Sequence, residues 1–314
     1  MRILFMGTAA FAVPSLESIF NSDHNIVGII TQPDRPFGRG LQLRPTPVKQ
    51  FALQHQLPVT TPDSIKDPIK LETIRQVNPE AIVVVAYGKI LPPALLQIPK
   101  FGCINVHGSL LPKYRGAAPI QWALIRGETE SGITTMYMND KMDQGDIIYQ
   151  EKIPILPEDN YDSLSIKLAQ LGGQLIIKTL AAVESGTAPR IQQNHEKATL
   201  APKINSADGK IDWSQSAIHI INRIRGVTPS PGAFTTVNSK RIRILHAQAT
   251  QGKPGISPGL ILVVGKHDEA GLIVQSGEGT AVQLLQVQPE SGKIMSATQF
   301  ARGQRLTEGT QFSI

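Results

Sequence analysis

The sequence predicts an α/β protein with a Rossmann-like open, mostly parallel sheet domain, then a linker and a small β-barrel domain of OB-like type. Three observations predict this class. Apolar strands alternate with helical patterns in the first part of the chain, a polar segment without periodicity follows, and short strands punctuated by glycine and proline fill the rest. We therefore expect a catalytic sheet domain over 1–189, a linker over 190–205 and a barrel over 206–314.

The first domain carries the alternating pattern. Strands are predicted over 2–6, 25–30, 81–86, 132–138 and 147–155, and helices over 13–20, 47–55, 67–77, 117–126 and 161–183. The run at 81–86 is apolar throughout, which is typical of a parallel strand buried on both faces. The turn after the first strand, at Gly7, lacks the later glycines of the dinucleotide fingerprint, which excludes a nicotinamide site.

The last third of the chain has shorter elements. A helix is predicted over 214–225, and strands over 233–237, 241–247, 259–264, 271–275 and 280–288. Residues 203–314 hold 12 Lys/Arg and 7 Asp/Glu, a net charge of +5, whereas residues 1–202 carry +1. A basic barrel is suited to a polyanionic partner such as nucleic acid, although a merely soluble basic surface would have the same charge.

Composition limits the function classes. Hydrophobic residues make up 41% and charged residues 18%, as in ordinary globular proteins. The single cysteine, Cys103, excludes an intramolecular disulfide and a cysteine-rich metal site, and it suits a reducing cytoplasm. No apolar run approaches the roughly 20 residues that span a membrane. We expect a cytoplasmic monomer with no metal and no membrane contact.

Residues 31–47 form a segment of another kind. Four prolines, two glycines and three arginines are not expected to form a strand or a packed helix. A loop of this length inside a compact domain is usually functional or disordered. Its arginines, Arg35, Arg39 and Arg44, would suit contact with phosphate on binding, and the alternative is a solvated surface loop.

Asn105 and His107 end an apolar run and stand two residues apart. On a strand they point to the same face, so an amide and an imidazole would lie side by side where ligands bind in parallel sheets. These groups suit the stabilisation of an oxyanion as a carbonyl becomes tetrahedral. Asp143, in a later loop, is a candidate to favour the charged imidazole. A structural histidine and an ordinary turn at Gly108 remain open alternatives.

The stretch Asn-x-His-Gly-Ser-Leu-Leu-Pro-x-Tyr-Arg-Gly at 105–116, with Asp-x-Gly-Asp at 143–146, resembles the signature of the 10-formyltetrahydrofolate-dependent formyltransferases. Leu111-Pro112 within it is expected to be extended, because the residue before proline avoids the helical region. Further matches at 31–40, 201–204, 211–213 and 223–233 extend the resemblance over nearly the whole chain and favour the branch that acts on initiator methionyl-tRNA.

The resemblance implies a role for each matched residue. Asn105, His107 and Asp143 would be the catalytic residues. The reduced folate would be bordered by Ser109, Leu110, Leu111 and Pro112 and bound by the backbone of Tyr87, Gly88, Lys89, Ile90 and Leu91. Arg39, helped by Arg35 and Arg44, would reach the acceptor end of the tRNA, and the basic residues of the barrel would hold its backbone.

The implied reaction is direct formyl transfer from 10-formyltetrahydrofolate to the α-amine of methionine on the initiator tRNA. Three other functions use the same residues or fold. The acceptor could be a small amine, such as a ribonucleotide or an amino sugar, or water could replace the amine in a formyltetrahydrofolate hydrolase. A tRNA-binding or formylfolate-sensing module without catalysis is the third alternative, and the intact set of Asn105, His107 and Asp143 weighs against it.

Overall fold

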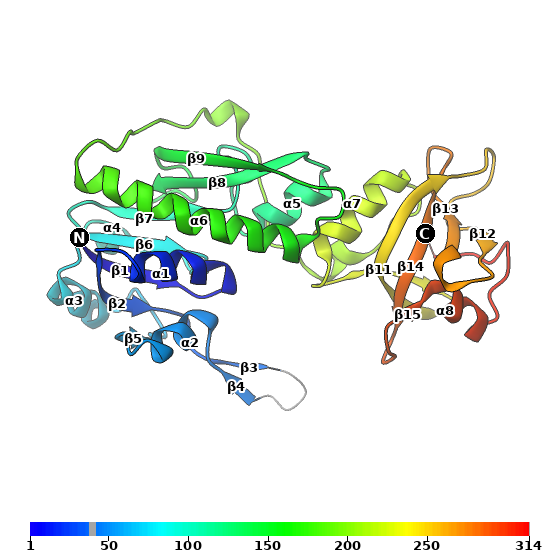
Figure 1. Cartoon of the computed structure of the whole chain (residues 1–314), viewed down its shortest axis with the longest axis horizontal. Helices are drawn as coiled ribbons and strands as arrows, with labels where there is room; N and C mark the ends of the chain where they lie inside the picture. The colour runs from blue at the N-terminus through cyan, green and yellow to red at the C-terminus, as the bar shows by residue number, and fades with distance from the viewer. Residues whose placement is uncertain (38–41, 314) are drawn as a thin grey trace. The chain divides into compact units, whose positions relative to one another are not determined.

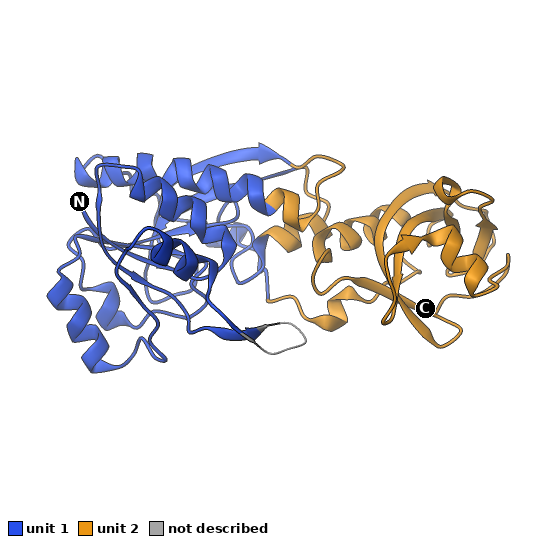
Figure 2. Cartoon of the chain, turned by 60° about the horizontal axis from the view of Figure 1, so that its bottom comes forward, with its two compact units in different colours: residues 1–119, 130–154, 165–202 blue, residues 120–129, 155–164, 203–314 orange. Residues whose placement is uncertain are grey.

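The computed structural model describes residues 1–37 and 42–313, with their helices and strands drawn in Figure 1. The chain forms two compact units (Figure 2). Unit 1 comprises residues 1–119, 130–154 and 165–202, and unit 2 comprises residues 120–129, 155–164 and 203–314. Unit 1 therefore extends through most of the predicted linker. Two short segments of the predicted first domain, residues 120–129 and 155–164, belong to unit 2 instead.

Unit 1 is built on a seven-stranded sheet of order β5-β2-β1-β6-β7-β8-β9. Its strands are β1 (Arg2–Gly7), β2 (Asn25–Ile30), β5 (Val59–Thr60), β6 (Ala81–Val85), β7 (Cys103–His107), β8 (Glu130–Tyr137) and β9 (Ile147–Pro154). The first five strands of the order run parallel, and β8 and β9 are antiparallel to their neighbours. The predicted open, mostly parallel sheet is confirmed, and β6 is buried along its whole length as its apolar run requires.

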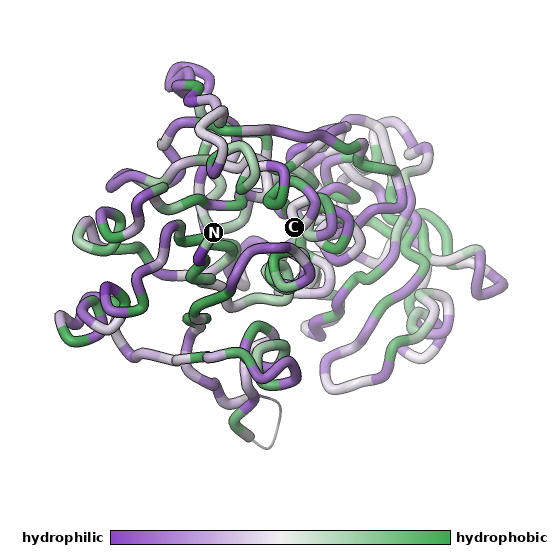
Figure 3. The backbone as a smooth tube through the Cα atoms, turned by 60° about the vertical axis from the view of Figure 1, so that its left-hand side comes forward, coloured by the Kyte–Doolittle hydropathy of each residue, from purple (hydrophilic) through white to green (hydrophobic). Residues whose placement is uncertain are grey.

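The helices of this half of the chain are α1 (Val13–Phe20), α2 (Pro47–Gln54), α3 (Pro68–Val77), α4 (Pro93–Leu96), α5 (Pro119–Ile125) and α6 (Tyr161–Glu184). Short 3-10 turns lie at Ala10–Ala12 and His195–Lys197. Hydrophobic and hydrophilic residues alternate along the helices (Figure 3), as expected of helices that cover a sheet. In α3, for example, Leu71 and Ile74 are buried, whereas Lys70 and Arg75 are exposed.

Two glycines let α6 pack closely against α1 and β7. A Cβ atom on Gly173 would lie 2.8 Å from the carbonyl oxygen of Pro14, and one on Gly172 would lie 3.1 Å from Val106 of β7. Val106 therefore faces α6, and Cys103 belongs to the core cluster that contains Leu95 of α4. Since neighbouring residues of a strand alternate, Asn105 and His107 share the face of Cys103, opposite to α6.

Helix α6 is the one helix in the described part of the chain that is long and apolar enough to cross a membrane. Half of its most apolar window is buried inside the protein, and Leu168, Leu175, Ile176 and Leu180 are almost completely inaccessible. This burial accounts for the apolar composition of α6 as a core helix.

Unit 2 contains an antiparallel sheet of order β10-β11-β14-β13-β12, with β15 paired to β14. The strands are β10 (Ala233–Val237), β11 (Lys240–Gln251), β12 (Ile261–Val264), β13 (Leu272–Gln275), β14 (Thr280–Pro289) and β15 (Met295–Ser296). The helices are α7 (Ala217–Val227) and α8 (Ala297–Gly303), with 3-10 turns at Ser206–Gly209 and Asp268–Ala270. The predicted strands are confirmed, whereas β15 and α8 were not predicted.

The last residues of the chain connect the two end strands of this sheet. The N–H of Phe312 donates to the carbonyl oxygen of Gly259, ahead of β12, and the N–H of Ser313 donates to that of Thr236 in β10, each over 2.8 Å. The ring of Phe312 is buried 5.5 Å from that of Trp213, centroid to centroid. This C-terminal segment therefore closes the sheet and fills its interior.

The expectation that residues 31–47 contain no strand is wrong. Arg35–Phe37 (β3) and Gln42–Arg44 (β4) pair as a two-stranded antiparallel ribbon, in which Pro36 lies opposite Leu43. A proline is tolerated there because both strands of such a ribbon have an open edge that its nitrogen can face. Arg39 lies at 38–41, outside the described residues.

Closure by the C-terminal segment predicts that Phe312 matters for the stability of unit 2. We expect Phe312→Ala to lower the free energy of unfolding by about 3–5 kcal/mol, because it leaves a cavity beside Trp213. Ile294→Ala is the control, since Ile294 is exposed and its truncation should cost less than about 0.5 kcal/mol. Urea unfolding followed by tryptophan fluorescence reports on this unit, because both tryptophans, Trp122 and Trp213, belong to it.

Candidate active site

Strand β7 places Asn105 and His107 at the carboxyl edge of the parallel part of the sheet. Asn105 lies opposite Val84 of β6 and Met136 of β8, and His107 lies opposite Thr134. The two side chains share one face, as their spacing predicted. Asn105 is half-buried, and within the described residues its amide makes no hydrogen bond, so it is available to a ligand.

The His107 imidazole is buried and contacted at both nitrogens. Its Nε2 lies 3.0 Å from the carbonyl oxygen of Tyr114, and because a carbonyl only accepts, Nε2 carries a proton. Its Nδ1 lies 3.8 Å from Oδ1 of Asp143, which is too long for a hydrogen bond but close enough for an ion pair. Nδ1 is therefore the nitrogen left for proton exchange with a substrate.

Asp143 belongs to the loop between β8 and β9. Its backbone has a φ of +54°, and its Oδ2 accepts the N–H of Gly116 over 2.8 Å. Two glycines make this contact possible. A Cβ on Gly116 would lie 2.4 Å from the carbonyl oxygen of Ala201, and a Cβ on Gly145 would lie 1.7 Å from that of Tyr137. The predicted proximity of Asp143 to His107 is present in the structure.

The segment after β7 folds into a turn rather than an extended strand. The Leu111-Pro112 peptide bond is cis, and the N–H of Lys113 donates to the carbonyl oxygen of Leu110 over 3.1 Å. The expected extended segment is therefore wrong, because this hydrogen bond closes a turn. The turn brings the Tyr114 carbonyl to His107.

The residues predicted to border the folate divide into two groups. Ser109 and Leu111 are buried, and the Ser109 hydroxyl donates to the carbonyl oxygen of Lys113 over 2.7 Å, so both help to build the turn. Leu110 and Pro112 are half-buried and have surface available to a ligand. The folate contacts of all four residues stay a prediction.

The segment predicted to bind the pterin follows β6. The carbonyl oxygen of Tyr87 accepts hydrogen bonds from Thr8 Oγ1 and Gln32 Nε2, over 3.0 and 3.1 Å. The Tyr87 hydroxyl is buried without a partner in the described part of the chain, and burial raises its pKa. Gly88, Lys89 and Ile90 are exposed, whereas Leu91 is buried. An exposed isoleucine beside an open glycine backbone suits a flat, partly apolar ligand.

Two residues near Asp143 were missed from the sequence. Arg115 is 5% exposed and Gln193 is 6% exposed, and Gln193 Oε1 accepts from Arg115 Nε and Nη2 over 3.1 and 2.6 Å. Burial lowers the pKa of the Arg115 guanidinium, while nearby Asp143 raises it. Arg115 belongs to the signature that pointed to the site, but Gln193 stands in a polar stretch with no pattern that could have identified it.

The arginines predicted to contact tRNA are only partly described. Arg35 in β3 and Arg44 in β4 are exposed, and they lie opposite each other in the antiparallel ribbon. Arg39 lies outside the described residues. The ribbon thus presents basic side chains, and their contact with tRNA stays a prediction.

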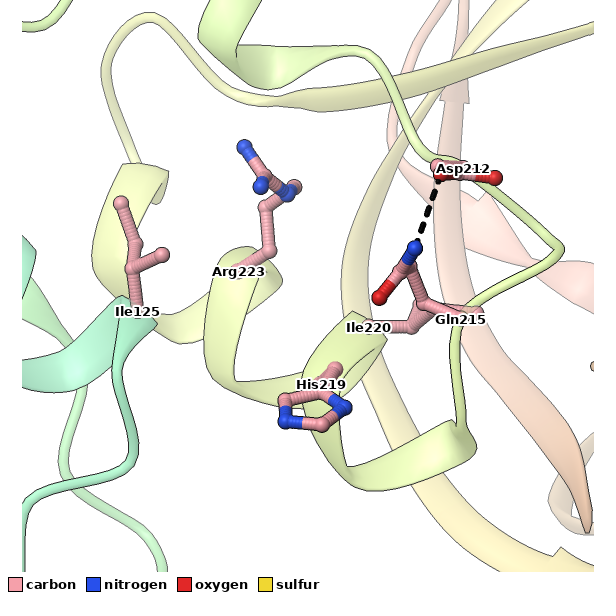
Figure 4. Close-up of a pocket in the computed structure, with 6 residues that line it drawn as sticks. All are labelled: Ile125, Asp212, Gln215, His219, Ile220 and Arg223. Carbon is pink, nitrogen blue, oxygen red and sulfur yellow. Dashed lines mark hydrogen bonds between the residues drawn. The ribbon is translucent and has the colours of Figure 1, made fainter. Parts of the chain in front are cut away.

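Unit 2 contains a separate small pocket of about 100 Å³, lined by Ile125, Asp212, Gln215, His219, Ile220 and Arg223 (Figure 4). The Asp212 carboxylate accepts hydrogen bonds from Ser214 and Gln215. These hydrogen bonds lower the pKa of Asp212, and the one from the Ser214 hydroxyl has the largest effect. Arg223 donates to the carbonyl oxygen of Asp208 over 2.8 Å. The polar groups of this pocket are thus used within the local turn.

Metal coordination and a cysteine nucleophile are two other chemistries that this fold could use. No group of three or more His, Cys, Asp or Glu side chains in residues 1–37 and 42–313 could hold a metal ion. Cys103 is buried in the sheet, and desolvation raises the pKa of its thiol to about 12. A thiol of that kind is a poor nucleophile.

Two family models match the chain. One, described as formyl transferase, matches residues 1–180, and the other, described as formyl transferase, C-terminal domain, matches residues 203–305. Two similar curated proteins are the methionyl-tRNA formyltransferases of Syntrophus aciditrophicus and Solibacter usitatus. The first is 46% identical over 99% of this chain and 98% of its own length, and the second is 44% identical over 98% and 97%.

The fold is also similar to that of solved structures. An N-formyltransferase from Helicobacter canadensis, solved with folinic acid and dTDP-3-aminofucose, aligns with a TM-score of 0.67 at 19% identity. The alignment covers 91% of this chain and 99% of that one. At this identity the likeness concerns the fold.

The burial of Cys103 predicts an unreactive thiol. With a pKa of about 12, roughly one thiol in 10,000 is ionised at pH 8, and access is blocked as well. Titration with a chromogenic disulfide should therefore detect no fast-reacting thiol in the folded protein and one thiol per chain after denaturation. Stoichiometric labelling of the folded protein within seconds would contradict the burial of Cys103.

Proposed function

The chain belongs to the formyl transferase family, and we propose that it transfers the formyl group of 10-formyltetrahydrofolate to the α-amine of methionine on initiator tRNA. The product is N-formylmethionyl-tRNA, used in translation initiation. The observation that carries the proposal is the pairing of the open Asn105 amide with the buried His107 imidazole at the carboxyl edge of the sheet. The names of the full-length relatives support methionyl-tRNA as the acceptor.

In the proposed reaction the amine of methionine attacks the formyl carbon, and a carbon–nitrogen bond forms. The formyl oxygen becomes an oxyanion. The Asn105 amide donates a hydrogen bond to it, and the protonated Nδ1 of His107 supplies a second donor. Holding both reactants at this edge makes the encounter nearly unimolecular.

The proton of the attacking amine leaves towards the Asp143 carboxylate, because both ring nitrogens of the charged His107 already carry protons. Nε2 is occupied by the Tyr114 carbonyl, so it keeps its proton and holds the ring in place. The gap of 3.8 Å between Nδ1 and Oδ1 leaves room for a reacting group or a water molecule to bridge them. The tetrahedral intermediate then breaks its bond to N10 of the folate, which takes the electron pair and a proton to give tetrahydrofolate.

We propose roles for the other predicted residues on the same basis. Leu110, Pro112 and the exposed backbone at Gly88 and Lys89 border the folate, and Ser109, Leu111, Tyr87, Ile90 and Leu91 support or flank that surface. The arginines of the ribbon and the basic residues of unit 2 hold the tRNA. Folate is a co-substrate, and the proposed mechanism uses no metal because side chains polarise the carbonyl. The proposed enzyme acts in the cytoplasm as a monomer.

Two alternatives use the same site. The net charge of +5 in residues 203–314 argues against a formyltransferase for a small amine, because a basic domain suits a polyanionic acceptor such as tRNA. A formyltetrahydrofolate hydrolase would place water where the amine lies, and it would release tetrahydrofolate without any amine.

We expect Asn105→Ala and His107→Ala each to lower kcat by roughly 100- to 1000-fold, because each removes one donor to the oxyanion. The assay follows formyl-methionine and tetrahydrofolate from 10-formyltetrahydrofolate with charged initiator tRNA. Asn25→Ala, at the amino end of β2, is the matched control and should keep full activity. Formylation of free methionine or of an amino sugar alone, or folate release without any amine, would reject the proposed acceptor.

We expect Arg39→Ala, and to a smaller extent Arg35→Ala and Arg44→Ala, to weaken tRNA binding much more than folate binding. Each lost phosphate contact should reduce the slope of log affinity against log salt by about 1. Arg75→Ala is the control, because Arg75 is an exposed arginine of α3 that pairs with Glu72. If the three variants bind tRNA with the affinity and salt slope of the parent chain, these arginines are not part of the tRNA site.

A further inference from the structure

A segment near the end of unit 1 runs alongside the turn that follows β7. The N–H of Arg115 donates to the carbonyl oxygen of Thr199 over 2.9 Å, and the N–H of Ala201 donates back to that of Arg115 over 2.8 Å. Thr199 Oγ1 also accepts the N–H of Tyr114 over 2.9 Å. We call residues 193–201 the strap. It is held to the same turn whose Tyr114 carbonyl contacts His107.

Gln193 begins the strap and uses its whole amide. Its Nε2 donates to the carbonyl oxygens of Asp143 and Gly145, over 2.9 and 2.8 Å. Its Oε1 accepts two hydrogen bonds from Arg115. Both amide hydrogens and both lone pairs of the oxygen are thereby used in a buried side chain, so Gln193 ties the Asp143 loop to the turn that carries Arg115.

Arg115 has a further contact with the strap. Its Nη2 also lies 3.0 Å from Nδ1 of His195. A buried guanidinium needs such acceptors, because its charge is costly to leave without partners. Arg115 is thus fixed by the strap through its backbone and its side chain.

The two loops joined by Gln193 meet again at His107. One supplies the Tyr114 carbonyl to Nε2, and the other supplies the Asp143 carboxylate opposite Nδ1. We infer that Gln193, acting with Arg115, is a positioning residue that holds Asp143 at its working distance from His107. This inference rests on the proposed function for its consequences in catalysis, but the placement of Asp143 can be measured without activity.

The chemistry of the amide makes the role specific to glutamine. Glutamate has nearly the same shape and could still accept from Arg115, but it cannot donate to the two carbonyl oxygens of the Asp143 loop. Its carboxylate would instead face them and repel them. Leucine would remove both sets of hydrogen bonds and leave the two carbonyls and Arg115 without those partners.

The activity-independent test uses the amide of Gly116, whose N–H donates to Asp143 Oδ2. Hydrogen exchange of this single amide, followed by NMR, reports whether Asp143 is in place. We expect Gln193→Glu and Gln193→Leu to accelerate the exchange at least 10-fold. Gln275→Leu is the matched control, because Gln275 is a buried glutamine in unit 2 that also bonds to backbone groups, and it should leave the Gly116 amide unchanged.

The kinetic test separates positioning from general damage. We expect the Gln193 variants to lose roughly 100-fold in kcat, the usual effect of a misplacement of about 1 Å. The KM values for folate and tRNA should stay within about 3-fold. In an Asp143→Ala background, Gln193→Leu should have almost no further effect on kcat, because a residue that acts through Asp143 has nothing left to position.

The outcomes distinguish this inference from the proposed function. Unchanged Gly116 exchange in folded Gln193→Glu and Gln193→Leu, or a full loss of kcat that persists in the Asp143→Ala background, would overturn the positioning role. If the parent chain transfers no formyl group to any amine, the proposed function fails, while the exchange of the Gly116 amide still decides whether Gln193 places Asp143.

Discussion

The imidazole of His107 is contacted at both ring nitrogens, and much of unit 1 is arranged around that constraint. Strand β7 provides the ring, the turn after it provides the Tyr114 carbonyl, and the β8–β9 loop provides Asp143. The placement of Asp143 depends on close approaches of the backbone at Gly116 and Gly145, where a Cβ atom would collide with a carbonyl oxygen. A neutral carbonyl on one side and a carboxylate on the other determine which nitrogen can exchange a proton.

The donors proposed for the oxyanion differ in how they are prepared. His107 is buried and oriented by its neighbours, whereas Asn105 is half-buried with an amide that no described residue engages. An unpaired amide costs little at a surface that water reaches, and it becomes a strong donor once a substrate excludes that water. The site thus combines an imidazole held in advance with an amide that gains its partner on binding.

Buried polar groups in unit 1 also explain why the polar segment after α6 is ordered. Arg115 is charged and almost inaccessible, and burial lowers its pKa against the opposing effect of Asp143. The strap satisfies its guanidinium through Gln193 and His195, and in doing so it bonds to the loop that carries the catalytic candidate. In unit 2 the C-terminal segment is also held by buried groups, but these are apolar. Phe312 packs against Trp213, and the segment bridges the two edges of the sheet.

Strands and helices with local signals could be predicted from the amino-acid pattern alone. The apolar run of β6, the short strands of unit 2 between glycines and prolines, and the shared face of Asn105 and His107 all follow from patterns a few residues long, which are independent of tertiary contacts. The pairing of β3 with β4 was missed because composition says little about how prolines are placed at an open edge. The surroundings of Asp143 could not be predicted in this way, because they are built from distant parts of the chain. Gln193 is 78 residues from Arg115 and 50 from Asp143, so its contacts depend on how distant loops pack. A glutamine in a polar stretch has the same local pattern whether it is solvated or buried with every hydrogen bond satisfied.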